Sequence, residues 1–154
     1  DAHECEMYVD TVLPNGVPVR GFIDRVDIAP TGQVRVVDYK TGKKPKPQWS
    51  QQAQFQMRFY ALVYWRLFDV VPTQLRLMYL KVIDSMFLTP STEELEFFER
   101  DLGDLWAKIE GDGRAGTFRP KTSKLCGWCP HQALCPDFGG TPPDYPGWPG
   151  STAD

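Results

Sequence analysis

The stretch from Gly21 to Lys40 places Asp24, Asp38 and Lys40 among β-branched and aromatic residues that a sheet would normally bury. Side chains alternate between the two faces of a strand, so Asp38 and Lys40 point to the same side, roughly 6–7 Å apart. The short turn at 29–32 can fold the strand that contains Asp24 back against Asp38. Two carboxylates with an ammonium group beside them suit a hard divalent cation and a developing negative charge.

An Asp and a Lys two residues apart most often lie on a solvated strand face. Here the neighbours Val34, Val36 and Val37 predict a strand that is buried. Burying an acid without a partner is expensive, so acids in such a strand indicate a bound metal or substrate.

A basic segment follows directly. Residues 41–47 contain Lys43, Lys44 and Lys46 together with a glycine and two prolines. Two interpretations remain open for it: a solvated linker, or a phosphate contact in which the lysines neutralise a nucleic-acid backbone.

The elements that must position these residues follow from periodicity and turn signals. Strands are predicted over 6–12, 17–28 and 33–40, and Asn15-Gly16 is a hairpin signal, so the three strands form an antiparallel meander. Apolar residues at i, i+3, i+4 spacing predict a helix over 50–68, whose later half is apolar almost all round and is expected to be buried against the sheet. The apolar positions of this helix are Phe55, Phe59, Leu62, Val63, Leu67 and Phe68. This helix is a crossover that allows parallel pairing of the next strand, over 74–82.

The second half of the core begins with an edge strand at 86–88 and a capping-box signature at 91–94. The helix that follows is expected to end at the glycines of 111–113. Its predicted core residues are Leu95, Phe98, Leu102, Leu105, Trp106 and Ile109.

Three cysteines cluster near the C-terminus in the pattern C-x2-C-x5-C, at Cys126, Cys129 and Cys135. This spacing places three thiolates within reach of one metal centre. Taken by itself it favours structural zinc, with His131 or Cys5 as the fourth ligand.

Several motifs together resemble a known family. Gly-Phe-Ile-Asp-Arg at 21–25, Val-Val-Asp-Tyr-Lys-Thr-Gly at 36–42 and Gln-Met-Arg-Phe-Tyr at 56–60 resemble the RecB-type branch of the PD-(D/E)XK nuclease superfamily. The resemblance extends from about Tyr8 to Pro136. It implies a restriction-endonuclease-like α/β (α+β-like) fold and a metal-dependent DNA nuclease, an exonuclease of DNA repair or recombination.

The resemblance also implies a role for each matching residue. Asp24 and Asp38, with the backbone carbonyl of Tyr39, would hold one or two Mg²⁺ or Mn²⁺ ions. Lys40 would orient the attacking water or stabilise the transition state. Gln56 and Tyr60 would border the active site, where Gln56 supports Lys40 or the scissile phosphate.

Many RecB-type nucleases use such a cysteine trio, with a fourth cysteine far upstream, to hold a [4Fe-4S] cluster. In that pattern the upstream cysteine and a metal-binding His belong to a helix before the strands. This sequence has no such helix, so neither role is assigned to Cys5 or His3. We therefore expect an N-terminally truncated fragment in which zinc is the alternative to the cluster.

Composition sets the remaining bounds. A chain of 154 residues with 42% hydrophobic and 24% charged residues is ordinary for a globular protein, and no apolar run could span a membrane. A cytoplasmic location is the default. The expected organisation is a nuclease core at 1–117, a Cys-rich metal segment packed on it at 118–138 and a Pro/Gly-rich tail at 139–154.

The net charge of −3 does not by itself indicate nucleic-acid binding. In a metal-dependent nuclease, however, the metal-binding acids make the net charge more negative, so global charge is a poor guide. DNA is the expected partner, together with a helicase or other repair-complex subunit. Two alternatives stay open: a catalytically silent nuclease-fold scaffold that binds DNA, and a zinc-dependent nucleic-acid-binding protein.

Overall fold

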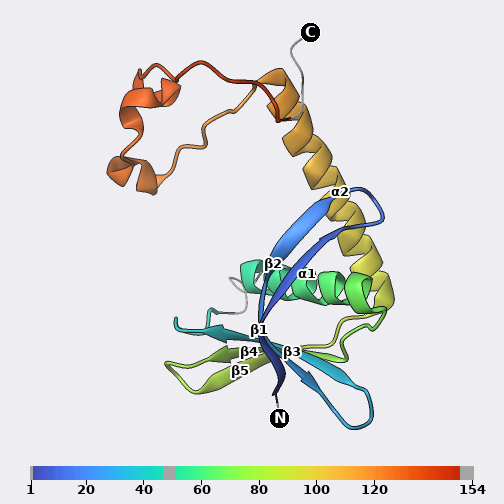
Figure 1. The fold of residues 1–154 in the computed structure, drawn as a ribbon. Helices are drawn as coiled ribbons and strands as arrows, with labels where there is room; N and C mark the ends of the chain where they lie inside the picture. The colour runs from blue at the N-terminus through green and yellow to red at the C-terminus, as the bar shows by residue number, and fades with distance from the viewer. Residues whose placement is uncertain (1, 47–50, 150–154) are drawn as a thin grey trace. The chain divides into compact units, whose positions relative to one another are not determined.

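The computed structural model describes residues 2–46 and 51–149, and the first part of the chain forms a mixed five-stranded sheet (Figure 1). The strand order is β1-β2-β3-β4-β5. The first three strands form the antiparallel meander, β4 runs parallel to β3, and β5 returns antiparallel at the edge. This arrangement confirms the predicted fold class. The strands are β1 (Ala2–Val12), β2 (Pro18–Ile28), β3 (Val34–Lys40), β4 (Gln74–Tyr79) and β5 (Asp84–Leu88).

The first strand begins earlier than the sequence predicts, at Ala2 instead of residue 6. Backbone pairing with β2 explains the difference, because Ala2 lies opposite Asp27 and Cys5 opposite Arg25 although the local sequence is polar. The ladder contains a register shift between residues 2 and 4. Such an irregularity is typical of a bulge that bends a strand.

The hairpin turn between β1 and β2 forms as predicted. Gly16 has a φ of 85°, a conformation that glycine adopts without steric cost, and its N–H donates to the Leu13 carbonyl at 2.8 Å. The side-chain amide of Asn15 donates to the Glu99 carbonyl at 2.7 Å. The turn is therefore tied to a helix more than 80 residues away in the sequence.

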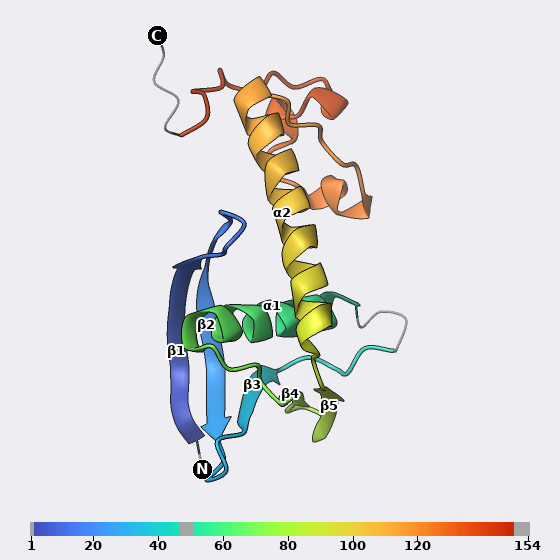
Figure 2. The ribbon, with the colours of Figure 1, turned by 90° about the vertical axis from the view of Figure 1, so that its right-hand side faces the viewer.

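The crossover helix α1 (Gln51–Phe68) lies across one face of the sheet (Figures 1 and 2). Its buried residues are Met57, Ala61, Leu62, Val63 and Tyr64. The predicted burial of the second half of the helix is confirmed for 61–64. Phe55, Leu67 and Phe68 instead remain 45%, 37% and 46% exposed, so three apolar residues of the predicted core face lie at its margin.

The second helix, α2 (Thr92–Ala115), begins at the predicted capping box. The Ser91 hydroxyl accepts from the Glu94 N–H at 3.1 Å, and the Glu94 carboxylate accepts from the Ser91 N–H at 3.3 Å. Within the first half of the helix, Glu99 pairs with Arg66 of α1. Among the described residues, neither helix has the length and apolar character needed to cross a bilayer.

The predicted end of α2 at 111–113 is wrong, because the helix continues to Ala115. The ring of Trp148 lies so close to Gly113 that an added Cβ would be 2.0 Å from it. Glycine at this position therefore allows close packing and does not terminate the helix. Gly116, with a φ of 64°, provides the left-handed residue that ends the helix.

Two of the expected core residues of α2 also differ from the prediction. Leu95, Phe98 and Leu102 are buried and Trp106 is half-buried, but Leu105 and Ile109 are 47% and 43% exposed.

The chain divides into two compact units, residues 1–103 and 104–154. In the second unit, Trp106 packs edge-on against Trp148 and Phe118 against Tyr145. Three short 3-10 turns follow: η2 (Lys124–Trp128), η3 (Gln132–Leu134) and η4 (Pro136–Phe138).

Candidate active site

The candidate site lies where β2 and β3 part. The pairing of these strands runs from Ile28–Val34 to Arg25–Val37, one position before Asp24 would face Asp38. Beyond this point β2 continues with β1 alone, and Figure 2 shows the β1–β2 hairpin extending past β3. The fork leaves room beside two acids that the meander has brought together.

Asp38 is the buried acid of this site, only 2% exposed, between apolar neighbours of β3. Burial in low dielectric raises the pKa of its carboxyl, the nearby Lys40 opposes this rise, and the negative charge of Asp24 adds to it. The Lys40 ammonium lies 2.7 Å from the Oδ2 atom of Asp38. Even so, within the described residues this oxygen accepts no well-aligned hydrogen bond.

Asp24 is fixed by the backbone of the neighbouring strand. Its Oδ2 atom accepts a hydrogen bond from the N–H of Tyr39 at 2.8 Å. The bond spans the fork and places Asp24 beside the residue that follows Asp38. One oxygen of each carboxylate is thus engaged by the protein, which limits how either side chain can rotate.

Lys40 connects the strand to the helix. Its ammonium donates to the side-chain oxygen of Gln56, and the Gln56 amide donates to the hydroxyl of Tyr60 at 3.1 Å. Gln56 and Tyr60 are one turn apart in α1, so their side chains lie on the same side of the helix. The structure therefore brings together four residues that the sequence singled out, in the order Asp38, Lys40, Gln56, Tyr60.

The two carboxylates suit a divalent cation. A buried carboxylate beside a second acid that repels it gains from a further positive charge bound between the two acids. Oxygen ligands are those that Mg²⁺ and Mn²⁺ prefer. Among residues 2–46 and 51–149 no three His, Cys, Asp or Glu side chains converge, so the acidic pair would need backbone, water or substrate oxygens as further ligands.

The predicted phosphate-binding lysines follow the site along the chain. Lys43, Lys44 and Lys46 are all exposed. Lys44 forms an ion pair with Asp84 at 2.9 Å and donates to the Ser85 carbonyl at 3.2 Å. This contact ties the basic segment to the start of β5.

Tyr79 belongs to the same neighbourhood, although sequence reasoning treated it only as an apolar position of a strand. It lies opposite Lys40 in the β3–β4 register and is 3% exposed. Its hydroxyl makes no hydrogen bond with the described residues. Burial raises the pKa of the phenol, and the nearby Lys40 lowers it in part. Only the register, which places Tyr79 beside the lysine, could have revealed this residue.

The opposite face of β3 contains a separate charged cluster. Arg25 contacts one oxygen of Asp27 at 2.6 Å, and Arg35 contacts the other at 2.8 Å. Burial opposes ionisation of Asp27, but the hydrogen bonds from both arginines outweigh it and lower the pKa of the carboxyl. We interpret this cluster as structural, because both oxygens of the acid are already occupied.

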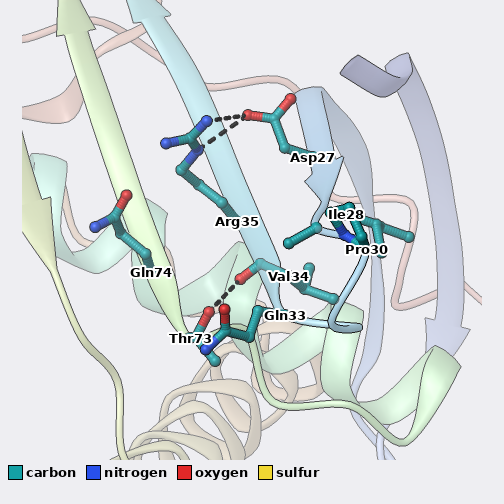
Figure 3. Close-up of a pocket in the computed structure, with 9 residues that line it drawn as sticks. Asp27, Ile28, Pro30, Gln33, Val34, Arg35, Thr73 and Gln74 are labelled. Carbon is teal, nitrogen blue, oxygen red and sulfur yellow. Dashed lines mark hydrogen bonds and ion pairs between the residues drawn. The ribbon is translucent and has the colours of Figure 1, made fainter. Parts of the chain in front are cut away.

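A cavity of about 470 Å³ adjoins this cluster, at the far ends of β3 and β4 from Lys40. Figure 3 shows Arg35 pointing to Asp27 and the Thr73 hydroxyl bound to the Val34 carbonyl. The cavity contains none of the predicted site residues. Its lining consists of Asp27, Ile28, Ala29, Pro30, Gln33, Val34, Arg35, Thr73 and Gln74.

The three C-terminal cysteines lie in the short turns of the second unit. Cys126 is part of η2 and its sulfur accepts from the Ser123 N–H at 3.2 Å, while Cys129 and Cys135 end η2 and η3. All three thiols are free and partly exposed. Cys5, on β1, belongs to the first unit.

A meander, a crossover helix and a D-x-K strand with a second acid beside it define a nuclease fold of the restriction-endonuclease type. The chain belongs to the PD-(D/E)XK nuclease superfamily, whose sequence profile matches residues 2–136. It is also 30% identical over 144 residues to the Gene 69 protein of Mycobacterium phage L5. That match covers 88% of this chain and 47% of the phage protein, so the chain spans about half the length of this relative.

Proposed function

We propose that this protein is a metal-dependent DNA nuclease and that Asp24 and Asp38 hold its Mg²⁺ or Mn²⁺. The observation that supports this most directly is Asp38, an acid only 2% exposed that lies close enough to Asp24 for the charge of Asp24 to raise its pKa, with the Lys40 ammonium 2.7 Å from its Oδ2 atom. Membership of a nuclease superfamily supplies the reaction class. The carbonyl of Tyr39, between the acid and the lysine, is proposed as a further ligand.

A divalent ion held by these acids would supply the positive charge that stabilises a phosphoryl transition state and makes a nearby water more acidic. Around it, Lys40 presents an ammonium to the developing negative charge or to the attacking water. Gln56 holds this ammonium in place through its side-chain oxygen, and Tyr60 fixes the amide of Gln56. Catalysis by positioning of this kind depends on keeping each group within hydrogen-bond reach.

The finer assignments are proposals as well. The RecB-type motifs favour an exonuclease that acts on single-stranded or unwound DNA in repair or recombination, supplied by a helicase or another repair-complex subunit. The cysteines 126, 129 and 135 are proposed to hold a [4Fe-4S] cluster, or zinc, with His131 as a candidate fourth ligand; the described residues do not bring three such side chains together, so these ligands would have to move to reach one metal. Metal analysis with an absorption spectrum distinguishes these two centres, since an iron–sulfur cluster absorbs broadly near ~400 nm.

The proposal is tested with Asp38→Asn and Lys40→Met, measured on single-stranded and duplex DNA with Mg²⁺ or Mn²⁺. Each variant should lose cleavage by at least about 100-fold, the range reported for the loss of a group that stabilises the transition state. Asp101→Asn, an exposed acid of α2, is the matched control and should cleave normally. Cleavage at the wild-type rate by both Asp38→Asn and Lys40→Met would contradict the proposal.

A further inference from the structure

The loop between β4 and β5, residues 80–83, is an exposed apolar hairpin tip. Ile83 is 96% exposed, and Leu80 and Val82 are 52% and 47% exposed. The fourth residue, Lys81, is also exposed. A single exposed apolar side chain is ordinary, but three within four residues form a point for contact with another molecule.

The backbone of the hairpin tip is strained. Ile83 has a φ of 50°, in the left-handed region where a β-branched residue is an outlier. Glycine or asparagine normally occupies such a position in a short hairpin loop. Isoleucine here gains no burial that would offset the strain, and strain of this kind gathers at functional sites.

The hairpin tip is held beside the candidate active site. The Leu80 N–H donates to the Lys40 carbonyl at 2.9 Å, and the Val82 N–H donates to the Tyr79 carbonyl at 3.3 Å. On the other side, Lys44 holds Asp84 at 2.9 Å. Figure 1 shows the hairpin tip and the basic segment after β3 on the same side of the sheet.

The charges around the hairpin tip favour a polyanion. Lys81 is within the tip, and Lys43 and Lys44 are in the adjoining segment. Asp84, the acid that follows the tip in the sequence, is paired with Lys44. An apolar point with lysines beside it matches a nucleic-acid strand, whose bases are apolar on their faces and whose phosphates are negative.

We propose that Ile83, with Leu80 and Val82, is an apolar wedge that packs against the terminal bases of the DNA substrate and separates them from the opposite strand. The inference rests on the proposed nuclease function and extends it. It assigns the hairpin tip to unpaired bases at the end of a duplex, next to the strand end that enters the site. Side chains of this kind unstack base steps in other DNA-binding proteins.

The test compares Ile83→Asn with Val70→Asn. Asparagine tolerates a positive φ, so Ile83→Asn should fold with an unchanged or higher melting temperature. Val70 is an exposed β-branched residue, 40% accessible, just before β4 and at the opposite end of that strand from the hairpin tip. Binding is measured in Ca²⁺, in place of Mg²⁺, with a duplex that has 2-aminopurine in its terminal pair.

Wild-type protein and Val70→Asn should raise the 2-aminopurine fluorescence, and Ile83→Asn should lose most of this rise. In Mg²⁺, Ile83→Asn should cleave duplex ends about tenfold more slowly, a difference of ~1.4 kcal/mol. Its cleavage of a single-stranded oligonucleotide should change less than twofold.

If the wild-type protein cleaves DNA and Ile83→Asn shows the same fluorescence rise and the same rate of duplex cleavage, the wedge is wrong. The nuclease proposal then remains intact. A wild-type protein that cleaves nothing would instead defeat the nuclease proposal, and the fluorescence alone would then decide the wedge. If Ile83→Asn abolishes self-association in sedimentation and leaves the fluorescence unchanged, the tip is a protein contact and the wedge is wrong.

Discussion

Lys40 of β3 donates a hydrogen bond to Gln56 of α1, so the strand with the candidate catalytic lysine and the crossover helix meet at one side chain. The ammonium also lies beside Asp38. A lysine on a flexible stem has many rotamers, and two oxygen partners on different elements restrict it to one direction. The position of Lys40 therefore depends on the helix as well as on its own strand.

Substitution of Gln56 by leucine should slow DNA cleavage about tenfold, ~1.4 kcal/mol in activation free energy, because Lys40 loses the acceptor that orients it. Tyr60→Phe, which removes only the support of Gln56, should have a smaller effect. The measurement is single-turnover cleavage at saturating Mg²⁺, with the pH profile recorded for each variant. Gln52→Leu, an exposed residue of the same helix, is the control and should match the wild-type rate.

Asp38→Asn should stabilise the metal-free protein at neutral pH. Burial raises the pKa of Asp38 above its unfolded value, so the folded state binds this proton more tightly than the unfolded chain does. The free energy of unfolding therefore decreases as pH rises from the unfolded pKa of about 3.9 through the folded one, and stays lower above it. Asparagine does not titrate, so the free energy of unfolding of Asp38→Asn does not decrease with pH in this way.

Mg²⁺ should make the wild-type protein more stable than Asp38→Asn, which reverses the order expected without metal. Binding at 100 times the dissociation constant adds about 2.7 kcal/mol to the free energy of unfolding of the wild-type protein. Asp38→Asn should gain little. Thermal melts with EDTA and with Mg²⁺ measure both effects, and an equal Mg²⁺ shift in the two proteins would remove Asp38 from the metal site.

The Asp27 cluster predicts the opposite pH dependence. Two arginines lower the pKa of Asp27 in the folded state despite its burial. Its contribution to stability is then fully present above the unfolded pKa of about 4 and is lost as pH falls through the folded value. Asp27→Asn should cost about 1–3 kcal/mol at pH 7, because Arg25 and Arg35 lose a charged acceptor. Urea melts should show this difference closing below about pH 4, and a difference independent of pH would contradict it.

Much of the fold and the site was predictable because local signals agree with the tertiary structure. Alternation and the Asn15-Gly16 turn predict the meander, and the spacing of apolar residues predicts α1. The register then brings Asp24 and Asp38 to the fork without any further information.

The parts that were missed depend on contacts between residues far apart in sequence. The sequence did not predict that Tyr79 lies near the candidate site, because only the parallel register places Tyr79 opposite Lys40. The positive φ of Ile83 could not be predicted from the sequence, because a β-branched residue rarely adopts this conformation. The glycines of α2 predicted a helix end, since nothing local reveals that Trp148 packs against one of them.

Two of these α2 glycines should respond oppositely to alanine. At Gly111 an added Cβ meets no atom within 4 Å, so Gly111→Ala should stabilise by about 0.5–1 kcal/mol through reduced backbone entropy. At Gly113 the same Cβ would lie 2.0 Å from the Trp148 ring, and the ring must move away. Gly113→Ala should therefore shift tryptophan fluorescence to the red and lower the melting temperature. Equal effects of the two substitutions would mean that Trp148 does not pack against this helix in solution.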